Sequence, residues 1–261
     1  VLTLSATGSE MSDSSVITKE EGLVKRGYNS DYSRPKFAIM NPELTLTLPA
    51  YQTAAGIVDM MAHILERYLS NTPDVQIGDR LAEGMLLAIM ETAQKLMADP
   101  SDYQARANIM WSGTIAHNDT CSLGRQEDWN SHAMEHEISA EYDVTHGAGL
   151  AVIFPAFLEY ASVHNPGKVA QLAHRVLGIA DSGDAAADAL AASRALKAWF
   201  RDVLKMPVRE SAGISGLIHL DVMIQSLRYM CHIACTCGKH HHRHVLTHGM
   251  PIRKEYSVVA V

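Results

Sequence analysis

The spacing of apolar residues changes near Pro49, and this change limits the possible fold more than any other feature of the chain. From about Leu48 to residue 205, apolar residues recur at the period of amphipathic helices. Pro49 stands where a first helical turn accepts proline. We therefore predict helices over residues 49–70, 76–98, 102–118, 131–142, 148–163, 167–178 and 183–204.

Several details of these helices follow from single residues. Ser131 is placed to cap the helix at 131–142, and Pro155 is expected to interrupt the helix at 148–163. Asn165 and Pro166 open the next helix, which Gly178 closes. In the helix at 76–98 we expect one apolar face, made of Ile77, Leu81, Met85 and Ala88.

The segment before Pro49 differs from the rest. Short apolar runs at residues 1–10, 14–22 and 36–44 are bounded by turn residues, which predicts three strands. Three short strands cannot bury a core of their own, so we interpret them as the end of a domain whose beginning is missing. The predicted domains are a strand-rich remnant at 1–47, a helical domain at 48–228 and an atypical Cys/His-rich tail at 229–261.

Composition excludes several classes of partner. The 261 residues carry a net charge of −7 and no run rich in Lys or Arg, which argues against nucleic acid and anionic membranes. No apolar run reaches the roughly 18 residues of a membrane span. No signal peptide is visible and three of the four cysteines lie close together, so we expect reduced thiols and a cytoplasmic protein.

Histidines gather in the segment WNSHAMEHEISAEYDVTHGAG, and a second motif lies earlier in the chain. His132 and His136 are one helical turn apart, as are Asp59 and His63 in GIVDMMAHILERY. Taken alone, such pairs are usually polar residues on a solvated face. The Asp59 pair, however, stands among apolar residues, and a buried charge requires a partner or a metal. With His146 added, one carboxylate and several imidazoles favour Fe(II) or Zn(II) over Mg(II) or Ca(II).

These motifs, together with LTLSATGSEMSDSSVIT at the start of the chain, resemble the iron-containing (group III) alcohol dehydrogenase family, most closely its butanol dehydrogenase branch. The resemblance covers residues 1 to about 205. It implies a mainly α fold of dehydroquinate synthase-like architecture. A helical metal-binding domain would follow a remnant of an α/β dinucleotide-binding domain. It also implies a divalent metal, Fe²⁺ or Zn²⁺, held by Asp59, His63, His132 and His146, with His136 near the substrate as a proton relay.

The resemblance also implies NAD or NADP as coenzyme. Hydride transfer requires removal of the alcohol proton, which a Lewis-acidic metal and a neutral histidine promote. Residues that match the segments of the family that contact the coenzyme are Thr3, Leu4, Ser12, Ser14, Lys25 and Thr45. Lys25 would reach the ribose or a phosphate, and Thr45 the nicotinamide end. For Thr3 and Ser12 an ordinary structural role in a strand is the alternative.

The chain departs from the family pattern in two places. The Gly-rich turn that cradles the pyrophosphate is absent, so we expect these residues alone to bind NAD(P)H weakly and to have doubtful activity. The tail segment CHIACTCGKHHHRH could bind a soft metal, although an incidental divergent end is the better interpretation.

Three functions remain open at this point. The first is an oxidoreductase that acts on a primary alcohol or an aldehyde, with a homodimer expected. The second is a metal-dependent lyase of the dehydroquinate synthase type, against which the residues Asp59 and His63 argue. The third is a non-catalytic metal-binding remnant.

Overall fold

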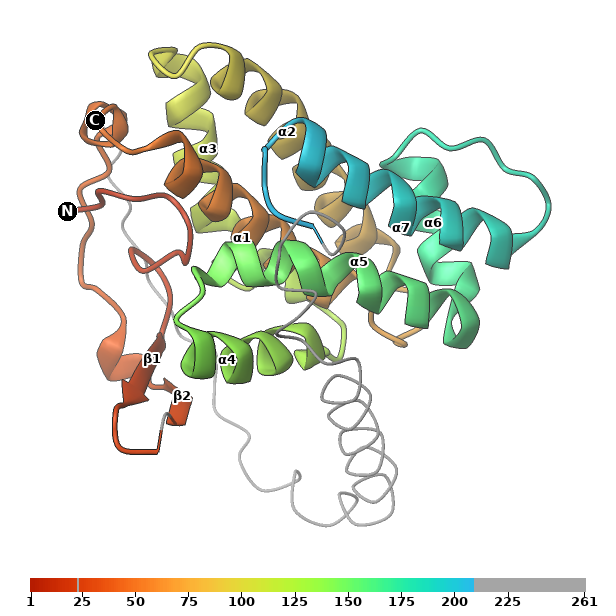
Figure 1. The fold of residues 1–261 in the computed structure, drawn as a ribbon, viewed down its shortest axis with the longest axis horizontal. Coiled ribbons are helices and arrows are strands. Elements are labelled where there is room, and N and C mark those ends of the chain that lie inside the picture. Colours follow the sequence, from red (N-terminus) through yellow and green to blue (C-terminus); the bar gives the residue numbers. More distant parts are fainter. Residues whose placement is uncertain (23, 209–261) are drawn as a thin grey trace. The chain divides into compact units, whose positions relative to one another are not determined.

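A computed structural model describes residues 1–22 and 24–208 of the chain (Figure 1). Their fold is mainly helical, as predicted. The Cys/His-rich tail at 229–261, the last part of the predicted helical domain and the segment DVMIQSLRYM lie outside the described residues.

Seven α-helices follow one another from Pro49 onward in the described part of the chain. Their bounds are α1 Ala50–Tyr68, α2 Gln76–Ala98, α3 Tyr103–His117, α4 Asn130–Tyr142, α5 His146–His164, α6 Pro166–Arg175 and α7 Ala185–Asp202. Side chains cap two of these helices: Asp102 accepts a hydrogen bond from the amide of Ala105, and Asp184 accepts from two amides of α7.

The hydrophobic core lies around α1, which is buried along almost its whole length. The helix α1 packs against α2, α3 and α5, while α7 covers α5 and α6 from the other side (Figure 1). Fully buried residues of this core include Ile57, Met60, Ile64, Leu86 and Phe154. A helix buried all round can hold a charged residue only if neighbouring helices compensate the charge.

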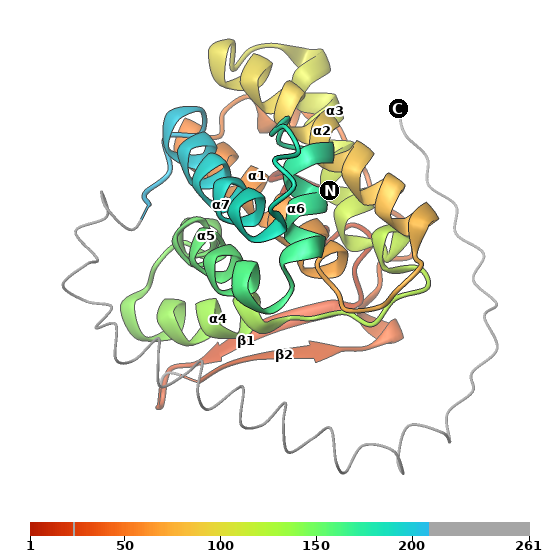
Figure 2. The ribbon, with the colours of Figure 1, turned by 90° about the vertical axis from the view of Figure 1, so that its right-hand side faces the viewer.

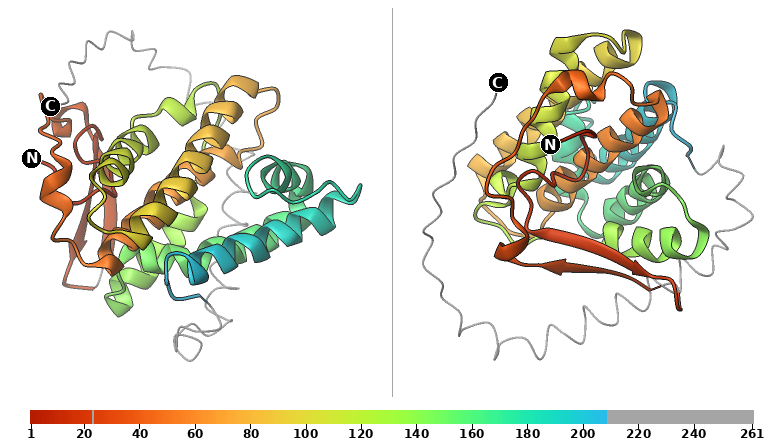
Figure 3. Two further views of the ribbon diagram at one scale, coloured as in Figure 1. Left: turned by 90° about the horizontal axis from the view of Figure 1, so that it is seen from above. Right: turned by 90° about the vertical axis from the view of Figure 1, so that its left-hand side faces the viewer.

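The N-terminal segment forms one antiparallel hairpin, β1 Ser14–Lys19 and β2 Val24–Asn29, in which Ser14 pairs with Asn29. The hairpin runs beside α4, as Figures 2 and 3 show from two sides. Two short 3₁₀ helices follow, η1 Asp31–Ser33 and η2 Pro42–Thr45.

The strand prediction for this segment was right only at residues 14–19. Residues 1–10 and 36–44 are not strands, because they meet through a backbone hydrogen bond from Leu2 N to Ile39 O (2.9 Å) rather than through a ladder. Gly8 turns the first run with φ of +59°, and Asn41 and Pro42 start η2. The strand β2 was missed.

Three helix details also differ from the predictions. The α2 face that contacts the core consists of Ala82, Leu86, Ile89, Ala93 and Leu96, whereas Ile77 and Leu81 are exposed. The small alanines mark this face in the structure but carry a weak signal in the sequence.

Ser131 does not cap α4; it lies buried inside the helix, two residues after Trp129 at the N-cap position. Pro155 does not interrupt α5, which continues to His164. The carbonyl of Pro155 accepts a hydrogen bond from Ser193 of α7 (2.8 Å), so tertiary packing stabilises the helix around the proline.

The helix α5 is unusually apolar. Among the described helices, it is the one whose length and composition would suffice to cross a membrane, and 67% of its apolar window is buried inside the protein. The burial shows that α5 is a core helix, since α1, α4, α6 and α7 pack against it.

A third 3₁₀ helix, η3 Thr120–Ser122, connects α3 to the loop before α4. Cys121 within it is buried and carries a free thiol. The side chain of Ser122 accepts a hydrogen bond from Arg67 of α1 (2.6 Å), which fixes this loop against the core helix.

Candidate metal centre

Asp59 lies in the middle of α1 with only 2% of its surface exposed. The residues before and after it, Val58 and Met60, are fully buried core residues. The sequence therefore places a carboxylate where water cannot reach it. An isolated buried carboxylate is costly, so its neighbours decide what it does.

Three histidine nitrogens surround one oxygen of this carboxylate. The Nε2 atoms of His63, His132 and His146 lie 3.6, 3.7 and 3.4 Å from Oδ1 of Asp59. Ligand atoms of Asp59, His132 and His146 all lie within 4.8 Å of one another. The four residues come from α1, α4 and the start of α5.

Local structure brings the last two histidines together. Asp143 at the end of α4 adopts the left-handed conformation with φ of 52°, so the chain turns into α5 within three residues. Gly147, next to His146, lies directly against the carbonyl of Ala55 in α1, and a Cβ atom there would overlap it. The close crossing of α1 and α5 thus sets the separation of Asp59 and His146.

The donor set fits a metal ion. Among the described residues, both oxygens of Asp59 and Nε2 of His132 are buried without a hydrogen-bond partner. Each unsatisfied buried polar atom costs about 1–3 kcal/mol, so a fold that gathers three of them needs a compensating group. One carboxylate with three imidazoles is a donor set suited to Fe(II) or Zn(II). The structure brings these four residues together, and their role as ligands stays a prediction.

Two buried carboxylates orient the histidines from behind. Glu66 Oε1 accepts a hydrogen bond from the backbone amide of His132 (2.9 Å) and lies 3.3 Å from Nδ1 of the same residue. Glu135 contacts Nδ1 of His146. Because a proton on Nδ1 satisfies each carboxylate, Nε2 is the ring nitrogen that faces Asp59 and that would bind a metal after losing its proton.

The charges at the site follow from these contacts. Burial alone would raise the pKa of Asp59, but the imidazoles of His132 and His146 and the charge of His63 hold it well below its usual range. Burial opposes the charged form of His146, yet Asp59 and Glu135 together raise its pKa to about 9. The pKa of His132 is raised against burial by Asp59 and Glu66. Burial and the charges of neighbouring histidines hold the pKa of His63 well below its usual range.

His136 lies beside the four residues, and none of the described ion pairs of Asp59 involves it. Its ring is 5.3 Å from that of His146 and 6.5 Å from that of His132, measured between centroids. Burial and then the charges of His146 and Lys25 lower the pKa of His136 to about 4, so it is neutral at neutral pH.

Lys25 of β2 reaches the same region. Its ammonium group donates to Ser139 (2.6 Å) and lies 3.8 Å from Oε2 of Glu135. The hairpin β1–β2 is therefore linked to α4 next to the metal centre.

The other residues predicted to contact a coenzyme lie on the N-terminal segment. Thr3 and Ser14 are exposed, and Leu4 and Ser12 are partly buried. Thr45 is buried in η2, where its hydroxyl donates to the carbonyl of Pro42 (2.7 Å). The contacts of these residues with a coenzyme stay predictions.

Three residues that contact the predicted ligands were not identified from the sequence: Glu66, Glu135 and His117. Glu66 follows His63 by three positions and Glu135 follows His132 by three, so each lies near the helix face of a predicted ligand. This spacing is a signal that could have identified both. His117 carries no such signal, because only tertiary packing brings it to His63.

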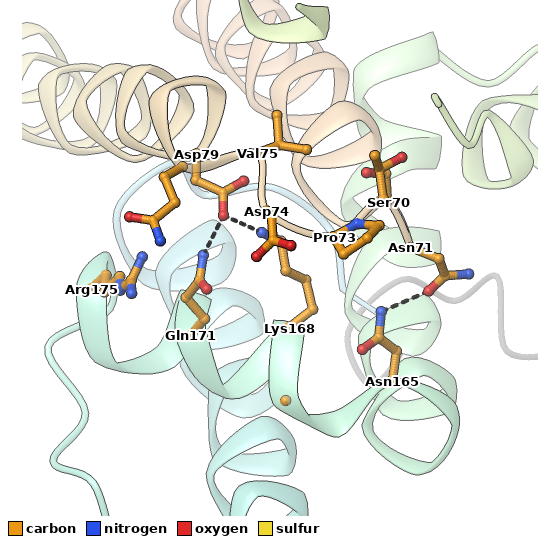
Figure 4. A pocket seen from close by; sticks show the side chains of 13 residues that line it. Ser70, Asn71, Pro73, Asp74, Val75, Asp79, Asn165, Lys168, Gln171 and Arg175 are labelled. Atoms are coloured by element: carbon orange, nitrogen blue, oxygen red, sulfur yellow. Dashed lines mark hydrogen bonds and ion pairs between the residues drawn. The ribbon is translucent and has the colours of Figure 1, made fainter. Parts of the chain in front are cut away.

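A pocket of about 370 Å³ lies elsewhere, between the α1–α2 loop and α6. Figure 4 shows Lys168 and Gln171 pointing toward Asp79 within it. Arg125 also pairs with Asp79 (2.9 Å), so the charge of this carboxylate is already compensated. None of the residues lining the pocket belongs to the metal centre, and we assign no chemistry to it.

Comparison with known proteins agrees with this geometry. The family model described as Fe-containing alcohol dehydrogenase family, C-terminal, matches residues 53–215. The probable NADH-dependent butanol dehydrogenase 1 of Bacillus subtilis is 43% identical over 70% of this chain and 47% of its own length. The NADPH-dependent aldehyde reductase YqhD of Escherichia coli is 38% identical over 70% of this chain and 48% of its own length.

Solved structures show the same likeness. The NADH-dependent butanol dehydrogenase A of Thermotoga maritima superposes with a TM-score of 0.77 at 40% identity, covering 81% of this chain and 53% of that one. Escherichia coli YqhD gives a TM-score of 0.80 at 34% identity, covering 87% and 58%. The chain spans about half the length of the curated relatives it matches.

Proposed function

The chain belongs to the Fe-containing alcohol dehydrogenase family. We therefore propose that it acts as an oxidoreductase that transfers a hydride between NAD(P) and a primary alcohol or aldehyde. The supporting observation is the convergence of three histidine Nε2 atoms on Oδ1 of Asp59, within 3.4 to 3.7 Å. This convergence accounts for a carboxylate buried in the middle of a core helix.

The residues that would hold the metal are Asp59, His63, His132 and His146. Nitrogen-rich donors of this kind bind Fe²⁺ or Zn²⁺, and both remain candidates. When bound, the metal supplies Lewis acidity, which lowers the pKa of an alcohol hydroxyl and polarises a carbonyl group. Glu66 and Glu135 hold the rings of His132 and His146 in the orientation that such binding requires.

His136 is the group best placed to move the proton of the alcohol. It is neutral in the metal-free protein, so one ring nitrogen can accept a proton and release it again. Its ring lies beside that of His146, and none of the described ion pairs of Asp59 involves it, which agrees with a role next to the metal rather than on it.

The identities of the coenzyme and the substrate are proposed by analogy with the relatives alone. The named relatives use NADH or NADPH, and they act on butanol or aldehydes. We propose a nicotinamide coenzyme of either kind, lying along Thr3, Leu4, Ser12 and Ser14. Location in the cytoplasm, assembly as a dimer and the choice between Fe²⁺ and Zn²⁺ also stay predictions.

A metal-reconstitution assay tests this function. The purified chain is stripped with a chelator and reloaded anaerobically with Fe²⁺ or with Zn²⁺, and oxidation of NADH or NADPH by butanal is followed by absorbance. We expect slow turnover, because the Gly-rich turn that holds the pyrophosphate is absent, and we expect it only after reloading. The Asp59→Asn variant should show none. Glu141→Gln is the matched control, because Glu141 is exposed at the end of α4.

The outcomes separate the candidate functions. A metal-loaded chain that oxidises neither coenzyme would contradict the proposal and favour a non-catalytic metal-binding protein. The lyase of the dehydroquinate synthase type is disfavoured by the donor set, since that class uses a glutamate where Asp59 and His63 stand.

A further inference from the structure

His117 at the end of α3 lies against the metal centre, although neither the sequence motifs nor the family resemblance assigns it a role. The centroid of its ring is 3.7 Å from that of His63. Ligand atoms of Asp59, His63 and His117 all lie within 4.8 Å of one another, as close as those of Asp59, His132 and His146. Asp59 is therefore shared by two sets of three donors.

The hydrogen bonds of His117 fix which ring nitrogen is available. Nδ1 lies 2.8 Å from the carbonyl oxygen of Gly113, one turn earlier in α3. A carbonyl only accepts, so Nδ1 carries the proton and donates, and Nε2 keeps its lone pair. Among the described residues, Nε2 of His117 is buried and has no hydrogen-bond partner.

The ring of His117 is held in place. His117 is 6% exposed, and Gly8 of the N-terminal turn lies so close to its Cβ and ring that a side chain at Gly8 would overlap them. A rigid imidazole with a free, buried and unpaired nitrogen resembles the ligand geometry of the other histidines.

The neighbouring cation does not satisfy this nitrogen. Arg67 directs its guanidinium to the carbonyls of His63 and Ala116, both at 3.0 Å, and to Ser122. Arg67 therefore does not donate a hydrogen bond to Nε2 of His117.

We propose that His117 is a further nitrogen ligand of the metal held at Asp59 and His63, which raises the protein donors from four to five. The inference rests on the proposed metal site and adds to it. Four imidazoles and one carboxylate select strongly for late first-row metals such as Fe(II), Co(II) or Zn(II) over Mg(II) and Mn(II). Five protein donors leave a six-coordinate metal one position for a substrate oxygen.

Cobalt substitution in the full chain tests the proposal without relying on activity. Co²⁺ is titrated into the chelator-treated protein, and its visible spectrum and dissociation constant are measured. In the ¹H NMR spectrum of the Co²⁺ form, each ligand histidine with a protonated Nδ1 gives one exchangeable, strongly shifted resonance. We expect four such resonances in the wild type and three in His117→Phe. We also expect an affinity about 10- to 100-fold weaker and a more intense visible band, typical of lower coordination.

Two further variants complete the test. His164→Phe removes an exposed histidine at the end of α5 and should leave all three measurements unchanged. His117→Gln, which can still donate to the carbonyl of Gly113, replaces His117→Phe if circular dichroism shows that the latter is unfolded, and it should also give three resonances.

The results distinguish the two hypotheses. Three shifted resonances in the wild type, with spectrum and affinity unchanged in a folded His117 variant, would overturn the role of His117 and leave the four-residue metal site intact. No Co²⁺ binding by the wild type would overturn the metal site itself and His117 with it.

Discussion

Oδ1 of Asp59 and Nε2 of His146 lie 3.4 Å apart, although they belong to helices far apart in the sequence. The distance is too long for a hydrogen bond with good geometry and suits two ligands of one ion. The relationship depends on the crossing of α1 and α5, and it has consequences that can be measured.

Replacing His146 by alanine should remove most of the bound metal, because one of the converging nitrogens is lost. Replacing His136 by alanine should spare the metal and slow turnover, because the ring of His136 lies beside the centre but takes no part in the described ion pairs of Asp59. Metal content after dialysis is measured by mass spectrometry for both variants. Loss of metal from the His136 variant would place that residue among the ligands.

Glu66→Gln should weaken metal binding by about 10- to 100-fold while the protein stays folded, since an amide orients the ring of His132 less well than a carboxylate. Isothermal titration with Zn²⁺ measures the change. The exposed Glu141→Gln serves as the matched control. Equal affinities in the two variants would show that the contact between Glu66 and His132 has no bearing on the metal.

Metal binding should release protons at neutral pH. The pKa of His146 is raised to about 9 in the metal-free protein, because Asp59 and Glu135 outweigh the effect of burial. His146 is therefore protonated below that pH and must lose its proton to bind a metal. Apparent affinity should rise about tenfold per pH unit for each proton released, and should stop rising above the pKa of His146.

Calorimetry in buffers of different ionisation enthalpy counts these protons, and His146→Ala should release fewer. The same raised pKa of His146 has the opposite pH dependence for the stability of the metal-free protein. Its stabilising contribution is fully present below the unfolded pKa of about 6.5 and is lost as the pH rises through about 9. A heat of binding that does not depend on the buffer would contradict the expected charge of His146.

Gly147→Ala should destabilise the protein by about 1–3 kcal/mol, because the new methyl group overlaps the carbonyl of Ala55 and forces α1 and α5 apart. Metal affinity should fall with it, since His146 is the preceding residue. Chemical denaturation of the metal-free protein measures the first effect. Gly84→Ala in α2 is the control: its Cβ would meet nothing within 4 Å, and alanine should stabilise that helix by up to about 1 kcal/mol.

The sequence was sufficient to predict the helices, and spacing together with the family resemblance indicated Asp59, His63, His132 and His146, which the structure brings together. Asp59 with His63, and His132 with His136, are spaced by one helical turn, so local geometry alone places each pair on one face. Buried neighbours around Asp59 then indicated that its charge required compensation. These signals need no knowledge of tertiary structure.

Other features could not be read in this way. His117 meets His63 only because α3 packs on α1, and no spacing along the chain encodes that contact. The runs at 1–10 and 36–44 have the alternation of strands, yet they form turns, coil and the start of η2 and make no ladder there. The alanine-rich buried face of α2 was not predicted, because alanine is neither strongly apolar nor strongly polar and gives a weak signal in the sequence.

The apolar character of α5 has a consequence for the fate of the unfolded chain. Residues 146–164 would be exposed as one long apolar segment if α1 and α7 released them, and such segments drive aggregation faster than refolding. The first residue of this segment is His146. A metal that binds only the folded chain would keep the segment buried up to higher temperature. We therefore expect heating to cause earlier and less reversible light scattering in chelator-treated protein than in metal-loaded protein, so the metal would act as protection against aggregation.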